Sequence, residues 1–285
     1  MGNSGVAGGK VTNTLNITTD LGDDTIEYTT KDAAGLQTTL TGTVNLGSGT
    51  DSLVLSVGGT QAASLNAAGL MVTGAETITI NGNVAADTVV GTAGDDVINP
   101  SGVAGGPVNG RDVMAGLGGK DTINATDASV DEIHFRSVDG SDTITGFSFT
   151  EDKIHFLDNA NLTGGSVDFA GFADTTEGAA GTDFAAAQET AGLYVEVDNV
   201  TQFGAAGAVN GAVFVINADN VNGATITTTS AVLNSYVLVD AGANLDVYFD
   251  SDWTDNAGRE KVMTLVGVAD TSQVDVTDFG IYTTV

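Results

Sequence analysis

The sequence predicts an all-β protein, in which a parallel β-helix is followed by a C-terminal antiparallel β domain with a sandwich-like fold. Short segments of alternating apolar and polar residues, rich in Val, Ile and Thr, recur along the chain, and only residues 182–189 have a helix-like composition. Gly, Asn and Asp separate these segments, and 39 of the 285 residues are Gly, which favours tight turns. A short acidic motif also repeats, and its spacing indicates the architecture.

The motif is Gly, any residue, Asp, any residue and an apolar residue. Its six copies contain Gly22 and Asp24, Gly49 and Asp51, Gly94 and Asp96, Gly110 and Asp112, Gly119 and Asp121, and Gly140 and Asp142. Degenerate copies have Glu76, Asp87, Asp131 and Asp152 at the acidic position. Nine residues separate Asp87 from Asp96, and nine separate Asp112 from Asp121. This spacing is too short for a helical repeat and fits one turn plus one strand of a parallel β-helix.

The repeats divide the chain into four predicted parts. Residues 1–11, rich in Gly, form a flexible lead, and residues 12–90 contain degenerate β-helix repeats. The motifs of residues 91–158 are denser and predict a β-roll. Residues 159–285 contain longer strand-like segments and wider loops, which indicate a separate β domain.

The charge of the chain limits its partners. Its 37 Asp and Glu residues face only 8 Lys and Arg, which gives a net charge of −29. This imbalance excludes nucleic acid as a natural partner and disfavours anionic membranes, because both are bound through Lys and Arg. It favours cations. The chain has no Cys for disulfides or a thiolate zinc site, and no uninterrupted apolar stretch long enough to span a membrane.

Two segments, GTAGDDVI (91–98) and AGLGGKDTI (115–123), resemble the nonapeptide G-G-x-G-x-D-x-U-x of the RTX (repeats-in-toxin) family, in which U is a large apolar residue. Residues 140–156 are similar to the segment that ends the β-roll of serralysin-type members, and residues 72–82 to segments of RTX-related surface-layer proteins. The resemblance implies a right-handed parallel β-roll, calcium in its turns, and type I secretion to the cell exterior.

The turns have the chemistry that calcium requires, namely roughly six to eight oxygen ligands from carboxylates and backbone carbonyls. Glycine lets the backbone curl so that its carbonyls point inward, and Asp adds a charged oxygen. In the family's roll, an ion lies between a turn and the turn two repeats later. Carried over, this arrangement places Asp96, Asp121 and Asp142 on one edge and Asp112, Asp131 and Asp152 on the other. The turn glycines Gly91, Gly94, Gly110, Gly116, Gly119 and Gly140 complete the predicted calcium sites.

Weaker candidates stand beside these turns. Gly22 with Asp24 and Gly49 with Asp51 belong to degenerate surroundings, so metal binding and a metal-free turn both stay open there. In DSDWTDNAGRE (250–260), Asp250 and Asp252 could ligate a cation. The segment lacks the EF-hand pattern, and an acidic hairpin loop is the alternative.

No sequence motif indicates an enzyme. HExxH and GxSxG are both absent, and His134 and His155 are expected to be ordinary strand side chains. The favoured function is a secreted calcium-binding structural protein that self-assembles into a surface layer, filament or extracellular matrix, with a cell-surface polysaccharide as a further partner. The alternative is the C-terminal secretion and folding module of a larger RTX adhesin or toxin. An ice- or glycan-binding face is disfavoured, because the Thr residues of 38–44 lack regular columns.

Overall fold

The computed structural model describes residues 9–100, 110–126, 129–135, 140–157, 193–206, 209–269, 271, 274 and 278–282. The described part of the chain is nearly all β, as predicted, and divides between Phe147 and Ser148 into two compact units. The strand Lys153–Leu157 belongs to the second unit and pairs with Phe279–Tyr282 near the end of the chain. No helix in these ranges is long and apolar enough to cross a membrane.

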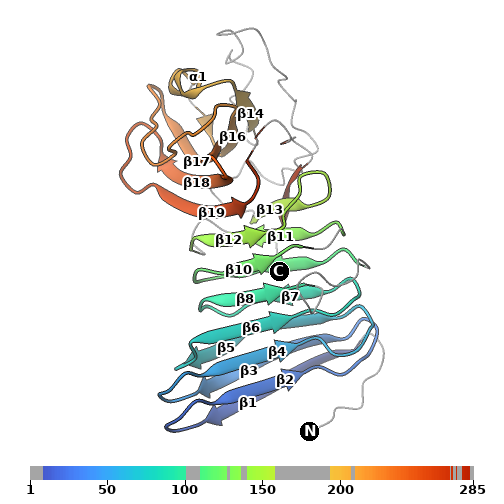
Figure 1. Ribbon diagram of the computed structural model, residues 1–285. Coiled ribbons are helices and arrows are strands. Elements are labelled where there is room, and N and C mark those ends of the chain that lie inside the picture. Colours follow the sequence, from blue (N-terminus) through green and yellow to red (C-terminus); the bar gives the residue numbers. More distant parts are fainter. Residues whose placement is uncertain are drawn as a thin grey trace. The chain divides into compact units, whose positions relative to one another are not determined.

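The first unit is a parallel β-solenoid whose strands lie stacked in Figure 1. The chain alternates between two sheets, so that each rung of the stack contributes one strand to each. The first sheet has the order β1 (Lys10–Thr18), β3 (Gln37–Asn45), β5 (Ser64–Thr73), β7 (Thr88–Val90), β9 (Val113–Ala115) and β11 (Glu132–Phe135). The second has the order β2 (Thr25–Thr29), β4 (Ser52–Ser56), β6 (Thr77–Asn81), β8 (Asp96–Asn99), β10 (Thr122–Asn124) and β12 (Asp142–Thr145). β1 begins inside the segment predicted as a flexible lead.

The strands stack in a register that aligns their apolar residues. In the second sheet, the strand pairing places one apolar side chain of each strand from β4 to β12 in a single buried column, formed by Leu55, Ile80, Ile98, Ile123 and Ile144. The first sheet has an equivalent column of Leu65, Val89, Met114 and Ile133. Burying each such side chain stabilises the fold by about 1.5–3 kcal/mol. The period-two alternation seen in the sequence is the alternation between this core and the outer face.

The rungs differ in length along the stack. The pairing of Lys10 with Gln37, and of Thr25 with Ser52, corresponds to a rung of 27 residues. The pairing of Val113 with Glu132 corresponds to only 19 residues, close to two nine-residue repeats. The pairing of Val97 with Thr122 corresponds to 25 residues and that of Thr122 with Thr143 to 21. The predicted nine-residue unit therefore fits single rungs, such as the one from Val113 to Glu132, whereas the first rungs contain longer strands and turns. This difference agrees with the sequence, in which the motifs of residues 12–90 are degenerate.

A polar ladder fixes the register on the outer face of the second sheet. Asn99 donates to Asn81 over 2.9 Å, Asn124 donates to Asn99 over 2.6 Å, and Thr145 donates to Asn124 over 2.6 Å. These residues end four successive strands. Because a slip of one residue would break every bond of the ladder, it specifies the register together with the core.

The second unit contains a mixed sheet. β14 (Leu193–Val197), β16 (Ala212–Ile216) and β17 (Val232–Asp240) are parallel, and β17, β18 (Asn244–Asp252) and β19 (Glu260–Val266) are antiparallel. The short β15 (Val209–Asn210) pairs with β17, β13 (Lys153–Leu157) pairs with β20 (Phe279–Tyr282), and α1 is Val200–Gly204. The antiparallel strands were predicted and the parallel ones were not. The helix-like segment 182–189 lies outside the described residues.

Trp253 is fully buried at the centre of the second unit. Phe203 of α1 packs edge-on against the Trp253 ring at 5.4 Å and against Phe214 of β16 at 5.2 Å. The indole N–H of Trp253 donates to the carbonyl of Ser235 over 3.1 Å. The aromatic core therefore joins the helix to both the parallel and the antiparallel part of the sheet.

Gly140 and Gly22 have similar backbone angles, and together they distinguish two costs of adding a side chain, namely backbone strain and overlap with a neighbouring rung. Gly140 has φ +117° and Gly22 has φ +126°, which L-residues rarely adopt. A Cβ at Gly140 would overlap the carbonyl of Gly119 in the neighbouring rung, whereas a Cβ at Gly22 would meet no atom. We expect Gly22→Ala to lower the free energy of unfolding by about 1–3 kcal/mol, from backbone strain alone. Gly140→Ala should cost more in the same urea titration, and equal losses would contradict the close approach.

Candidate functional site

Acidic side chains form two columns at the points where the chain enters its strands. One column, before the strands of the second sheet, contains Asp24, Asp51, Glu76, Asp96, Asp121 and Asp142. The other, before the strands of the first sheet, contains Asp87, Asp112 and Asp131. The structure thus places Asp96, Asp121 and Asp142 on one edge, and Asp112 and Asp131 on the other, as the sequence predicted. Asp152 lies before β13 in the second unit.

Hydrogen bonds from the backbone of one rung to the carboxylate of the next link most members of the columns, although the N–H of Glu76 donates to the carbonyl of Asp51 instead. The N–H of Asp96 donates to Oδ1 of Asp121 over 2.8 Å, and the N–H of Asp121 donates to Oδ1 of Asp142 over 3.0 Å. The same bond joins Asp24 to Asp51, Asp87 to Asp112 and Asp112 to Asp131, over 2.8, 2.7 and 3.1 Å. Each rung therefore orients one carboxylate oxygen of the rung beside it.

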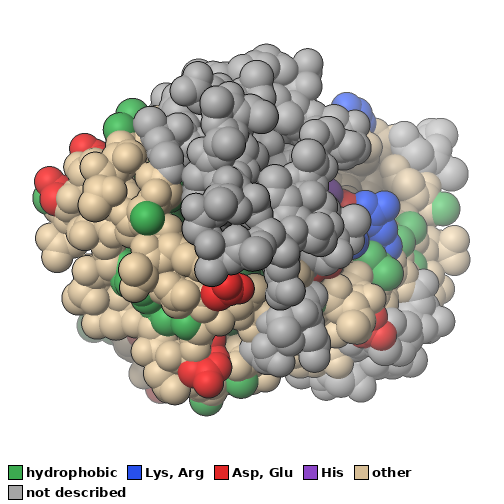
Figure 2. Space-filling model, turned by 90° about the horizontal axis from the view of Figure 1, so that it is seen from above, with side chains coloured by type: hydrophobic (Ala, Val, Ile, Leu, Met, Phe, Trp, Pro, Cys, Tyr) green, Lys and Arg blue, Asp and Glu red, His purple; other side chains and the backbone are tan. Residues whose placement is uncertain are grey.

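Stacking the rungs buries most of these carboxylates, whereas Glu76 is exposed and Asp24 is partly buried. Asp51, Asp96 and Asp121 are each only 1% exposed. Among the described residues on the face seen in Figure 2, the acidic side chains lie as separate spots. Burial raises the pKa of Asp121 to about 8, with a further contribution from the Asp142 charge, and it raises the pKa of Asp96 to about 7.

The second oxygen of the carboxylate divides the turns into two kinds. In the first kind, it accepts the N–H of the residue four positions earlier. Asn83 donates to Asp87 over 2.6 Å, Thr92 to Asp96 over 2.7 Å, and Ser148 to Asp152 over 2.9 Å. The first oxygen of Asp87 accepts from Ala63 as well, over 2.9 Å. These turns satisfy Asp87 and Asp96 by hydrogen bonds within the chain, as a metal-free turn does.

Asp51 and Asp121 belong to the second kind. Their Oδ2 atoms are buried and have no hydrogen-bond partner in the part of the chain that the structure describes. Four positions earlier stand Gly47 and Leu117, with φ +85° and +72°, and neither donates to the carboxylate. A buried carboxylate oxygen without a donor is costly, which makes it a place where a cation would be bound. Oδ2 of the partly buried Asp24 is also without a partner.

The Asp121 turn is the most specialised of these sites. Leu117 occupies the left-handed region, at a cost of about 1–2 kcal/mol for a residue with a Cβ. Gly116 is necessary there, because a Cβ would overlap Oδ2 of Asp121. Such strain persists where the surroundings impose it and is typical of ligand-binding turns. The turn combines a charged oxygen with a glycine-lined backbone, which is the donor set of a hard cation such as calcium.

Sequence reasoning missed the role of the acidic residue that precedes the motif Asp. Oδ1 of Asp23 accepts the N–H of Thr50 over 2.9 Å, and Oδ1 of Asp95 accepts the N–H of Lys120 over 2.8 Å. These acids therefore also bridge adjacent rungs, on the exposed side of the turn. The paired Asp-Asp in GDDTI and GDDVI was the available signal.

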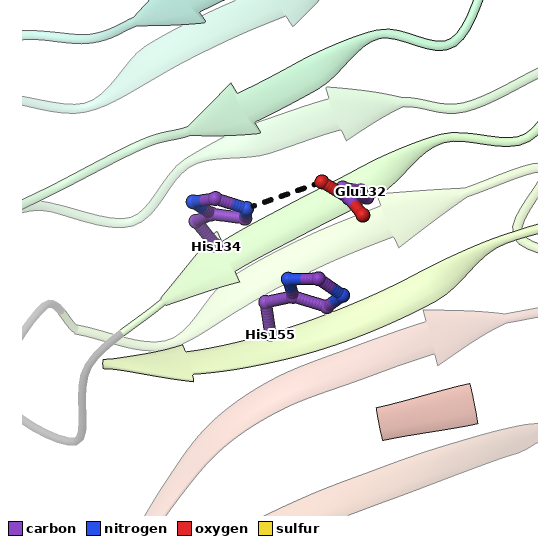
Figure 3. A group of neighbouring side chains, drawn as sticks. All are labelled: Glu132, His134 and His155. Atoms are coloured by element: carbon purple, nitrogen blue, oxygen red, sulfur yellow. Dashed lines mark ion pairs between the residues drawn. The ribbon is translucent and has the colours of Figure 1, made fainter. Parts of the chain in front are cut away.

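Figure 3 shows the histidines that were expected to be strand side chains, and both do lie in strands. His134 lies beside Glu132 on β11, with 3.7 Å between Nε2 and the carboxylate, and both residues are 7% exposed. Arg111 forms an ion pair with the same Glu132. His155 lies on β13 in the second unit.

In the acidic segment of residues 250–260, Arg259 is the counter-ion of Asp250. Asp250 is fully buried, and its Oδ2 lies 3.1 Å from Nε of Arg259, while its Oδ1 accepts the N–H of Asp252 over 2.9 Å. The guanidinium of Arg259 also stacks on Trp253, 3.9 Å from the ring centre. Asp252 caps a turn by accepting the N–H of Thr254 over 3.0 Å, which holds the pKa of Asp252 below its ordinary value. These contacts favour the hairpin-loop alternative for Asp250 and Asp252 over a cation site.

No protein family model, curated protein or solved structure matches the chain. The likeness to RTX repeats therefore stays a prediction from the turn residues themselves.

The raised pKa values predict how the stability of the metal-free chain depends on pH. The pKa is about 6 for Asp87, about 7 for Asp96 and about 8 for Asp121 in the folded state, against an ordinary value of 3.8. The folded state therefore holds more protons than the unfolded state between about pH 4 and pH 8, and stability should fall as the pH rises through this window. We expect a lower melting temperature at pH 8 than at pH 5 in metal-free buffer.

Asp121→Asn is the control for this effect, because the net charge of the whole chain also changes with pH. The variant should show a weaker pH dependence than the wild type. A wild-type melting temperature that is constant or increases from pH 5 to pH 8 would contradict the burial of these carboxylates.

Proposed function

We propose that the chain is an extracellular structural protein whose solenoid is stabilised by calcium bound in its acidic turns and which assembles with further copies of itself. The observation that carries the proposal is the Asp121 turn, where a buried carboxylate oxygen without a partner lies against a strained, glycine-lined backbone. The corresponding Oδ2 of Asp51 extends the proposal to an earlier rung. Asp142 and the backbone carbonyls of Gly116 and Gly119 are the further ligands proposed for the Asp121 site.

Calcium suits these turns better than other common metals do. The donors are carboxylate and carbonyl oxygens, which hard cations prefer, and the chain has no Cys. Extracellular calcium modules bind with dissociation constants of roughly 10⁻⁴–10⁻³ M, so weak turn sites fill outside the cell. This consideration supports an extracellular location.

Charge repulsion explains why a structural protein of this kind would require the ion. Adjacent rungs of a sheet lie about 4.8 Å apart, so each column brings like charges close together when its carboxylates are ionised. A cation between rungs would neutralise them and bind only the folded chain, which stabilises it by mass action. The proposed role is mechanical, because a repeat stack becomes a stiff rod when each interface between rungs is stable.

Two single substitutions test the calcium site. Asp121→Asn keeps an oxygen acceptor for the N–H of Asp96 and removes the charge, so the metal-free chain should be as stable as the wild type or more stable. Calcium at about 100 times its dissociation constant should stabilise the wild type by about 2.7 kcal/mol. Asp121→Asn should lose much of that gain in a urea titration with calcium.

Asp87→Asn is the matched control, because both oxygens of Asp87 accept N–H groups. It should lower the metal-free stability and keep the calcium gain. If calcium stabilises the Asp121→Asn variant and the wild type equally, Asp121 is not a ligand.

Assembly is tested by negative-stain electron microscopy of the purified chain, with millimolar calcium and with EGTA. Ordered layers or filaments that form only with calcium are the expected result. Single particles under both conditions would contradict self-assembly and favour the alternative, a calcium-binding module of a larger secreted protein.

A further inference from the structure

The solenoid ends at β1 and β2 with two strands that each have one neighbour. Within the described residues, β1 pairs only with β3 and β2 only with β4, and Figure 1 shows both strands at the end of the stack. β1 is nine residues long, contains no Pro and no bulge, and has one charged residue, Lys10. Exposed edges are normally blunted by short strands, bulges, Pro or several charges. A long, regular edge such as β1 is suited to pair with another strand.

The hydrogen bonds of β1 show which of its groups point outward. The carbonyl of Gly9 accepts the N–H of Gln37 over 3.0 Å, and the N–H of Thr19 donates to Asn45 over 2.9 Å. In a parallel pair, alternate residues direct both backbone groups to the same neighbour. The odd-numbered residues of β1 therefore bond to β3. The N–H and C=O groups of Lys10, Thr12, Thr14, Asn16 and Thr18 point to the open side.

Apolar side chains are partly exposed at the end of the stack formed by β1 and β2. Ile17 is half-buried, whereas Val44, its partner in the next rung, is fully buried. Ile26 of β2 is likewise half-buried, whereas its partner Leu53 is fully buried. Leu21, in the turn between β1 and β2, is 82% exposed. A strand added beside β1 would cover part of this apolar surface.

We propose that β1 pairs with β1 of a second copy of this chain, antiparallel and around a two-fold axis at Thr14. This inference rests on the proposed self-assembly and identifies one contact within it. In this register Thr14 faces itself, Thr12 faces Asn16, and Lys10 faces Thr18. On the inner side, Val11 faces Ile17 and Asn13 faces Leu15. The edge is self-complementary, because every outward donor meets an outward acceptor of the other copy.

The distribution of charge favours a second copy at β1. Two chains of charge −29 repel each other, so they approach best where neither presents an acid. β1 has no Asp or Glu, and its register brings no like charges together. β2 has Glu27 at the centre of its edge. The contact is therefore assigned to β1.

Thr14→Pro tests the pairing with little change to the solenoid. Pro removes the N–H that points to the open side and none of the bonds from β1 to β3, as Pro on an edge strand does. Thr14→Val is the matched control, because both substitutions lose the hydroxyl contact with Thr41 while Val keeps the N–H. In sedimentation velocity with calcium, we expect the wild type and Thr14→Val to dimerise or assemble. Thr14→Pro should dissociate about tenfold more readily, since the contact loses one hydrogen bond per copy.

A cysteine variant tests the register independently of any effect of Pro on folding. The chain contains no Cys, so Thr14→Cys introduces the only thiol. With a short thiol-to-thiol cross-linker, it should form covalent dimers much faster than Thr41→Cys, which lies beside Thr14 on the next strand and away from the proposed axis.

The outcomes separate this inference from the proposed function. If the wild type assembles in calcium, and Thr14→Pro assembles as well as Thr14→Val, the copies meet elsewhere and only this inference is overturned. Equal cross-linking of Thr14→Cys and Thr41→Cys would also overturn it. If the wild type is a monomer with calcium, both proposals of assembly are wrong.

Discussion

Most rungs of the solenoid place a carboxylate where the chain enters a strand, and the next rung covers it. The backbone N–H at that point donates to the carboxylate of its neighbour, as between Asp96 and Asp121. This bond holds the rungs in register and at the same time removes the acid from water. The rest of the structure depends on how the second oxygen of each carboxylate is satisfied, because a buried and unpaired charge opposes the stack that buries it.

The chain satisfies that oxygen in two ways. At Asp87 and Asp96 a residue four positions earlier donates its N–H, and the turn is complete by itself. At Asp121 the corresponding residue is Leu117, whose positive φ accompanies an unpartnered oxygen. One motif can therefore form either a turn that satisfies its own carboxylate or a turn that leaves one carboxylate oxygen without a hydrogen-bond partner among the described residues. The difference lies in the backbone before the Asp, so that the solenoid can contain both kinds.

Much of the fold could be predicted from the sequence because period-two alternation and Gly-Asp spacing act locally. The two edges followed from counting repeats, and Asp96 and Asp121 lie on the predicted one. The rung lengths could not be predicted, since the first strands, such as Lys10–Thr18, extend beyond any nine-residue unit. The partner of Asp250 was also hidden, because Arg259 reaches it through a hairpin whose pairing no local pattern specifies. The sequence shows that Thr92 and Leu117 are different residues. It does not show the backbone angle φ at either position, on which the hydrogen bond to the Asp four residues later depends.

At Asp250, the chain balances a buried carboxylate with a side chain of its own, Arg259. The guanidinium neutralises a fully buried Asp250, stacks on Trp253 and donates to backbone carbonyls, so that one residue completes a polar site inside an apolar core. The chain has only 8 Lys and Arg for 37 Asp and Glu, and it cannot repeat this arrangement at every buried acid. Asp51 and Asp121 have no such cation among the described residues. The charge of Asp121, whose pKa is raised by burial, is removed by a proton or balanced by an ion from solution. Protonation and cation binding depend on pH in opposite ways. Protonation is favoured at low pH, whereas calcium binding is favoured at higher pH, where the carboxylate is ionised.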